Sequence, residues 1–122
     1  YCYDKLNDNP NLDILGQMEW RDETDMHEMC TGFMAIRSSP KTLKFFEPIP
    51  NKEYSNDQWY VNHYKSKINY ELLPIDLFPN GKYFYMNHAK LYPYLIHFNF
   101  VFSHDKKDRM KGHKKWYMPL NP

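Results

Sequence analysis

Short apolar runs alternate along this chain with segments that carry helix-start signals, and this alternation limits the possible folds more than any other feature. The apolar runs that have the length and flanking residues of strands are 33–37, 69–73 and 94–100. Capping residues and prolines predict helices at 41–47, 57–67 and 104–115. Alternating strands and helices are typical of α/β domains, so we expect a mixed sheet flanked by helices.

Two stretches carry different local signals. Residues 1–29 are polar, contain the turn cluster Asn-Asp-Asn-Pro-Asn and lack clean periodicity, which predicts irregular structure. Pro-Asn-Gly at 79–81 predicts a tight turn that leads into an aromatic strand. A chain of 122 residues is expected to form a single domain, residues 1–122, or a fragment of one.

Composition argues against binding to nucleic acid and against a membrane span, and it leaves the state of the two cysteines open. The net charge is +1, so the chain has no overall field that would favour nucleic acid. No apolar stretch reaches the length of a membrane span. Cys2 and Cys30 can pair or stay free, and the sequence does not decide between these states.

The run at 94–100 contains two polar residues that point to a site. Side chains alternate between the faces of a strand, so we expect His97 and Asn99 to share one face with Leu95, and Ile96 and Phe98 to share the buried face. A neutral imidazole can bind a divalent metal, and a carboxamide can hold a phosphate or a sugar hydroxyl. The alternative is a half-buried histidine that is hydrogen-bonded to the backbone.

A basic segment follows this run directly. Its cationic residues are Lys106, Lys107, Arg109, Lys111, Lys114 and Lys115. They can form a solvated helix face, or a clamp for a diphosphate that is bound next to a metal-binding histidine. Adjacent Trp116 and Tyr117 allow a nucleic-acid surface, but the nearly neutral total charge argues against it.

Two further pairs of residues are candidates for a site. Asp57 and Gln58 stand at a predicted helix start, where they can act as cap residues or, in a pocket, recognise hydroxyls or take part in base chemistry. Thr31 and Gly32 come just before the strand at 33–37. A glycine at that place lets the backbone approach a ligand closely.

Taken in order, four blocks of the chain resemble the C-terminal half of a nucleotide-diphospho-sugar transferase, a glycosyltransferase with the GT-A fold. The blocks begin with Cys-Thr-Gly-Phe at residue 30, Asn-Asp-Gln-Trp at 56, Leu-Pro-Ile-Asp at 73 and Ile-His-Phe-Asn at 96, and the resemblance covers residues 13–118. It implies that a sugar is transferred from a nucleotide-diphosphate donor to a hydroxyl of a glycan or protein acceptor.

The resemblance also implies roles for individual residues. Asp57 and Gln58 would be the catalytic pair on the sugar and acceptor side, and His97 would bind Mn²⁺ or another divalent cation. The implied substrate-binding residues are Thr31, Gly32, Asn99, Lys107 and Lys111. Cys30 stands where the family usually has asparagine, and Ser103 where glycine is common.

One motif of the family is absent from this sequence. It contains no Asp-x-Asp and lacks the nucleotide-binding half that would carry that motif. We therefore expect the chain to be the C-terminal part of an enzyme, whose partners would include the missing N-terminal half or other protein subunits. The alternative is a degenerate domain that acts as a non-catalytic binding or assembly module, for example in a large complex or a virus particle.

Overall fold

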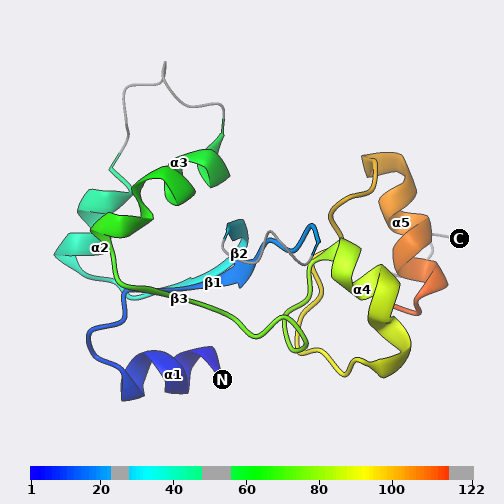
Figure 1. Cartoon of the computed structure of the whole chain (residues 1–122), viewed down its shortest axis with the longest axis horizontal. Coiled ribbons are helices and arrows are strands. Elements are labelled where there is room, and N and C mark those ends of the chain that lie inside the picture. The colour runs from blue at the N-terminus through cyan, green and yellow to red at the C-terminus, as the bar shows by residue number, and fades with distance from the viewer. Residues whose placement is uncertain (23–27, 48–55, 116–122) are drawn as a thin grey trace, which may run out of the picture.

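The computed structural model describes residues 1–22, 28–47 and 56–115, and three of its strands form one mixed sheet (Figure 1). The strands are β1 (Ile14–Met18), β2 (Met29–Ile36) and β3 (Tyr70–Leu72). The helices are α1 (Cys2–Asp8), α2 (Pro40–Phe45), α3 (Asp57–Tyr64), α4 (Gly81–Asn87) and α5 (Ser103–Gly112). Strand order is β2-β1-β3, with β1 antiparallel to β2 and parallel to β3. The expected α/β class with a mixed sheet is confirmed.

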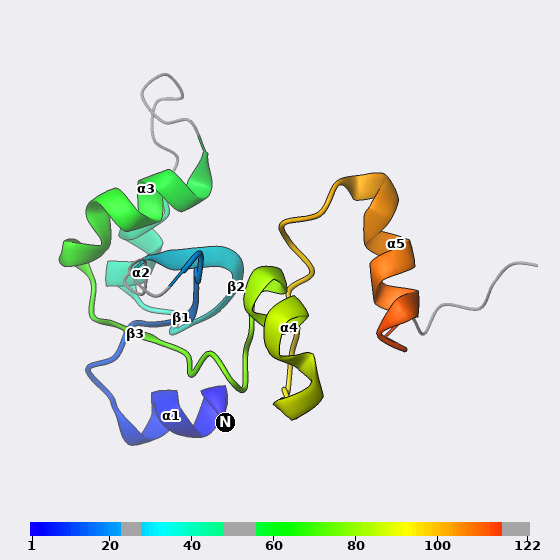
Figure 2. The ribbon, with the colours of Figure 1, turned by 45° about the vertical axis from the view of Figure 1, so that its right-hand side comes forward.

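Both faces of the sheet are covered by helices. Ile14 on β1 packs in a cluster with Phe45 of α2 and Val61 of α3, while its neighbour Leu15 packs in a second cluster that includes Leu6 of α1. In Figure 1, α2 and α3 accordingly lie on one side of the sheet and α1 on the other. Figures 1 and 2 both show α4 and α5 next to each other, beyond one end of the sheet.

The expectation that residues 1–29 are irregular was wrong. This stretch contains α1 and the central strand β1. Four of the five residues of β1 are buried, and none of them is exposed. A strand that is covered on both faces shows no alternation of polar and apolar residues, so the periodicity that marks a half-buried strand is missing here.

The aromatic strand expected after Pro-Asn-Gly is a helix, α4. The side chain of Asn80 accepts a hydrogen bond from the backbone N–H of Tyr83 and so caps the helix. Its amide also donates to the backbone carbonyl of Trp20 at 2.7 Å, in a fully buried position. Asparagine before glycine is a signal for a turn as well as for a helix cap, and tertiary contacts decide between them.

The expectation of a strand at 94–100 was also wrong. The segment makes one isolated bridge, between Asn80 and His97, and is no part of the sheet. The N–H of Asn99 donates to the carbonyl of His97 at 2.8 Å, and Phe100 has a left-handed φ of 58°. Both features bend the backbone away from an extended conformation, so the predicted alternation of faces does not apply.

The remaining elements agree with the sequence to within a few residues. Strands at 33–37 and 69–73 correspond to β2 and β3, and the helices at 41–47 and 104–115 correspond to α2 and α5. The helix at 57–67 consists of α3, capped by Asn56, and a 3₁₀ turn over Lys65–Lys67. In the part of the chain that the structure describes, no helix is long and apolar enough to cross a membrane.

Candidate active site

His97 lies against β2, in contact with the Cys-Thr-Gly-Phe block. Its backbone N–H donates to the carbonyl of Pro79 at 3.1 Å, which fixes the segment beside the sheet. A Cβ atom on Gly32 would lie 2.1 Å from Cε1 and 2.4 Å from Nδ1 of the imidazole. Only a residue without a side chain leaves room for the ring, so Gly32 determines where His97 lies.

Cys30 contacts the same imidazole, with 3.4 Å between its Sγ and Nδ1 of His97. Burial raises the pKa of the Cys30 thiol to about 12; a backbone hydrogen bond from Gly32 opposes the shift, and the carboxylates of Glu19 and Asp57 add to it. The thiol therefore stays protonated at neutral pH. Cys30 and Cys2 are both free cysteines in this structure.

The imidazole of His97 is neutral at neutral pH. Burial lowers its pKa, and the positive charge of Lys106 lowers it further. Lys106 is a half-buried residue of α5, and its charge acts on this ring. The sequence favoured Lys107 and Lys111, which are one helical turn apart on α5 and are both exposed.

The carboxylate of Asp57, at the start of α3, accepts a hydrogen bond from the N–H of Gln58 at 2.9 Å, and its charge adds to the raised pKa of the Cys30 thiol. The position of α3 is set by Asn62, whose side chain accepts from the N–H of Met29 at 2.8 Å and donates to its carbonyl at 2.7 Å. The two bonds satisfy the backbone N–H and carbonyl of Met29 in the way that a neighbouring strand would. No signal in the sequence marked Asn62 as part of the site, although it belongs to the same block as Asp57.

Gln58 borders a different space from His97. It lines a cavity of about 310 Å³ whose other lining residues are Arg21, Glu28, Asn56, Trp59, Asn62 and His63. His97 is not among them. The two residues of the predicted pair therefore have different surroundings. The carboxylate of Asp57 affects the pKa of Cys30, and Gln58 lines the cavity of about 310 Å³.

Asn99 has different surroundings from the other predicted residues. Oδ1 of Asn99 accepts a hydrogen bond from the N–H of Gly81 at 2.6 Å, and its carbonyl accepts one from the hydroxyl of Tyr85 at 3.0 Å. Asn99 therefore fixes the start of α4 and does not lie with His97 on a strand face. Thr31 is half-buried in β2, between Cys30 and Gly32.

One residue next to this group is absent from the sequence predictions. Glu19 directly follows β1, is 4% exposed and hydrogen-bonds to Cys30 through its side chain. It could have been found only by recognising β1 as a strand, because its burial depends on that strand. Among the described residues, no three His, Cys, Asp or Glu side chains form a group that could hold a metal ion.

Comparison with known proteins finds a family model and a relative that match this chain. The family model described as nucleotide-diphospho-sugar transferase matches residues 3–111. A UDP-galactose:fucoside alpha-3-galactosyltransferase from Dictyostelium discoideum is 30% identical over 125 residues, which cover 79% of this chain and 19% of that protein. None of the solved structures gives a significant match.

The chain therefore belongs to the nucleotide-diphospho-sugar transferase family. It spans about a fifth of the length of the galactosyltransferase that it matches. The first and the last of the blocks that carry the family resemblance are in contact, because Gly32 belongs to the first and His97 to the last.

Proposed function

We propose that this chain forms the C-terminal part of a glycosyltransferase that moves a sugar from a nucleotide-diphosphate donor to a hydroxyl. The contact between Gly32 and His97 supports this proposal most directly. It joins two of the family's blocks around an imidazole that also touches Cys30 and whose pKa is lowered by the charge of Lys106.

The reaction makes two demands on the protein. The bond between the anomeric carbon and the diphosphate oxygen breaks, and its electron pair leaves with the nucleoside diphosphate. The acceptor oxygen forms the new bond to that carbon, and its proton passes to a base. In our proposal, Lys106 offsets the charge on the leaving diphosphate, while Asp57 orients the acceptor hydroxyl and takes its proton. Gln58 would hold sugar hydroxyls from the adjoining cavity.

The described residues do not by themselves fit a complete Mn²⁺ site. His97 is one candidate ligand, and its Nδ1 faces the protonated thiol of Cys30 at 3.4 Å. Divalent cations of this type take several ligands, and no group of three is present in the described part of the chain. The proposal therefore assigns His97 as a single ligand to a divalent cation, and no step above depends on that ion.

The relative named above suggests which substrates to test first. Its name gives UDP-galactose as donor and a fucoside as acceptor. We propose the same pair as the first candidates for this protein.

The test is a transfer assay on the full-length protein with these two substrates. We expect Asp57→Asn to lower turnover by about 10²-fold or more, because it removes the proposed base. His97→Ala should lower turnover by a similar factor, because it removes the proposed cation ligand. Tyr3→Ala, which removes an exposed aromatic ring on α1, is the control and should leave turnover unchanged.

A thermal melt of each variant separates the possible roles of His97. Low turnover with an unchanged melting temperature supports the site. Normal turnover with a lowered melting temperature would mean that His97 only packs against Gly32 and Cys30. A folded wild-type protein that transfers no sugar from any nucleotide donor would favour the non-catalytic assembly module.

A further inference from the structure

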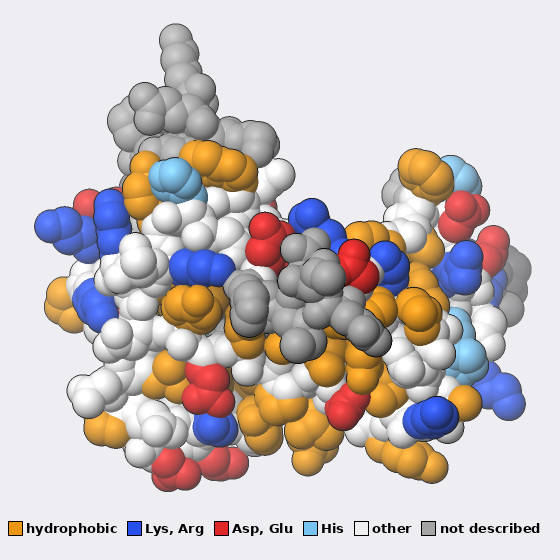
Figure 3. All heavy atoms as spheres, in the orientation of Figure 1, with side chains coloured by type: hydrophobic (Ala, Val, Ile, Leu, Met, Phe, Trp, Pro, Cys, Tyr) orange, Lys and Arg blue, Asp and Glu red, His pale blue; other side chains and the backbone are white. Residues whose placement is uncertain are grey.

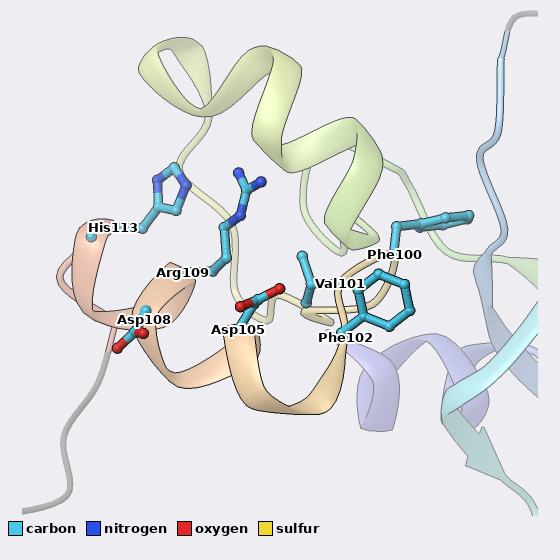
Figure 4. A pocket seen from close by; sticks show the side chains of 8 residues that line it. Phe100, Val101, Phe102, Asp105, Asp108, Arg109 and His113 are labelled. Atoms are coloured by element: carbon cyan, nitrogen blue, oxygen red, sulfur yellow. The ribbon is translucent and has the colours of Figure 1, made fainter.

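A cavity of about 740 Å³ lies between α5 and the segment that leads into it (Figure 4). Asp105, Asp108, Arg109 and Gly112 form one wall, and their spacing places them on one face of α5. The other wall includes Phe100 and Phe102. The volume is in the range of small-molecule sites, roughly 300–1,000 Å³.

Two aromatic rings border this cavity instead of packing into a core. Phe102 is 74% exposed, and its ring stacks on that of His104, with 5.8 Å between centroids. Phe100 is 49% exposed and has a left-handed φ of 58°. That conformation is unfavourable for a bulky residue, and such strain is concentrated at ligand-binding positions.

The polar groups of the cavity are already held in place. The guanidinium of Arg109 lies over the ring of Tyr85 on α4, 5.2 Å from its centroid. Figure 4 shows Arg109 and His113 reaching from α5 toward α4, and the carboxylate of Asp105 beside Val101 and Phe102. A ligand would therefore meet a wall whose cation needs little further ordering.

The charges of the cavity favour a neutral ligand over a nucleotide. Two carboxylates, Asp105 and Asp108, face one guanidinium, Arg109. Burial lowers the pKa of His113, and the charges of His88 and Arg109 lower it further, so His113 adds no charge at neutral pH. The net charge of −1 disfavours a phosphate, whereas carboxylates are good acceptors for hydroxyl donors.

The two sides of α5 differ in chemistry. Lys106, whose charge lowers the pKa of His97, is half-buried, while Asp105 and Asp108 are exposed. In Figure 3, hydrophobic, acidic, basic and histidine side chains all lie at the end of the molecule that carries α5. The same helix thus carries a cation that acts on His97 and two carboxylates that line the cavity.

We infer that this cavity binds a sugar ring of the acceptor glycan, with Phe102 stacking on its C–H face and Asp105 accepting its hydroxyl hydrogen bonds. The negative face of an aromatic ring attracts the weakly positive C–H groups of a pyranose, and a polyhydroxylated, uncharged ligand uses both kinds of wall. The role as acceptor rests on the proposed transferase function, but the binding of a sugar does not.

Binding is tested on the ¹⁵N-labelled full chain by NMR titration with methyl glycosides of neutral hexoses. We expect the largest shifts at 100–113. Phe102→Ala and Phe100→Gly should each weaken binding at least about fivefold, because each removes one stacking ring. Phe100→Gly also suits the left-handed backbone, so its fold is not at risk. Asp105→Asn should also weaken binding, because it removes a carboxylate that accepts hydrogen bonds from the sugar hydroxyls. Tyr3→Ala is the matched control for loss of an exposed ring, and Asp8→Asn is the control for loss of an exposed carboxylate.

The outcomes separate this inference from the proposed function. Shifts that lie elsewhere, or variants that bind glycosides as well as the wild type does, would overturn the inference. So would shifts at 100–113 that are caused by inorganic phosphate or UDP and not by glycosides. In the transfer assay, the Phe102 variant should raise KM for the acceptor and leave donor hydrolysis unchanged. A wild type that binds glycosides here but transfers no sugar would overturn the proposed function alone.

Discussion

Gly32 and His97 fit together because one of them has no side chain: a Cβ on Gly32 would lie 2.1 Å from Cε1 of the imidazole. The backbone of Gly32 does not have a positive φ, so alanine is compatible with the strand itself. We expect Gly32→Ala to displace the ring and to lower the free energy of unfolding by about 1–3 kcal/mol, as overpacking does. The ring resonances of His97 and a urea melt measure the two effects.

Gly112→Ala is the matched control for that substitution. A Cβ there meets no atom within 4 Å, and the residue lies in α5. Alanine at an exposed helical position should stabilise the protein slightly, by about 0.5–1 kcal/mol, and leave the resonances of His97 unchanged. Unchanged resonances in Gly32→Ala as well would contradict the steric argument.

Lys106 is expected to set the protonation of His97, because its charge lowers the pKa of the imidazole. Lys106→Met should therefore raise that pKa in an NMR titration, while Lys107→Met and Lys111→Met should not. The lowered pKa also has a consequence for stability. As pH falls below about 6.5, the unfolded chain takes up a proton that the folded ring resists, so stability decreases through that window. The decrease should be smaller in Lys106→Met.

Asp13 should make stability fall in acid. Burial disfavours its charge, but Nζ of Lys41 at 2.5 Å and the N–H of Asn69 at 2.7 Å outweigh this and lower the pKa of the carboxyl. Its contribution is complete above the ordinary carboxyl pKa of about 3.9 and is lost as pH falls through the lower folded value. Asp13→Asn should cost about 1–3 kcal/mol at neutral pH in denaturant melts. Exposed Asp4→Asn should cost much less.

Asn80 joins α4 to the end of β1. Asn80→Ala would remove the helix cap and leave the carbonyl of Trp20 without its 2.7 Å donor. We expect a loss of about 1–3 kcal/mol, read from thermal melts. Asn87→Ala, at the other end of α4, removes a single side-chain bond to the carbonyl of Tyr83 and should cost less. Equal losses of stability in the two variants would show that the cap and the buried bond of Asn80 contribute no more than the single bond of Asn87.

The isolated 122-residue chain should not bind Mn²⁺ and a nucleotide-sugar tightly. The sequence has no Asp-x-Asp, and the described residues offer no group of three metal ligands. Calorimetry with UDP-galactose and Mn²⁺ measures this directly. Micromolar affinity would mean that residues of this chain complete a nucleotide site.

The sequence predicted those elements whose signals are local. The cap at Asn56 and the Ser-Pro start of α2 identified two helices, and the apolar run after Gly32 identified β2. The sequence did not predict β1 or α4, because the conformation of both segments depends on tertiary burial. Ile14 and Leu15 are buried on opposite faces, which removes the alternation that marks a strand.

The candidate site was predictable only through the order of its blocks. Residue type and family resemblance identified His97, Asp57 and Gly32. They could not show that Asn99 would bind Gly81, because this depends on a turn at Phe100 that no residue preference predicts. They also could not select Lys106 from several neighbouring lysines, since that choice depends on how α5 is rotated against the segment that holds His97.

The strand order β2-β1-β3 has a consequence for how the chain folds. β1 and β2 form an antiparallel pair that is nearly local, whereas β3 joins β1 only after the intervening helices have been made, with Asp13 and Asn69 separated by 56 positions. Pairing at such a separation is slow, because a long loop must close before any contact forms. During synthesis, one edge of β1 therefore stays open until residues 70–72 have left the ribosome, and nascent chains that stop before that point should be the ones most prone to aggregate.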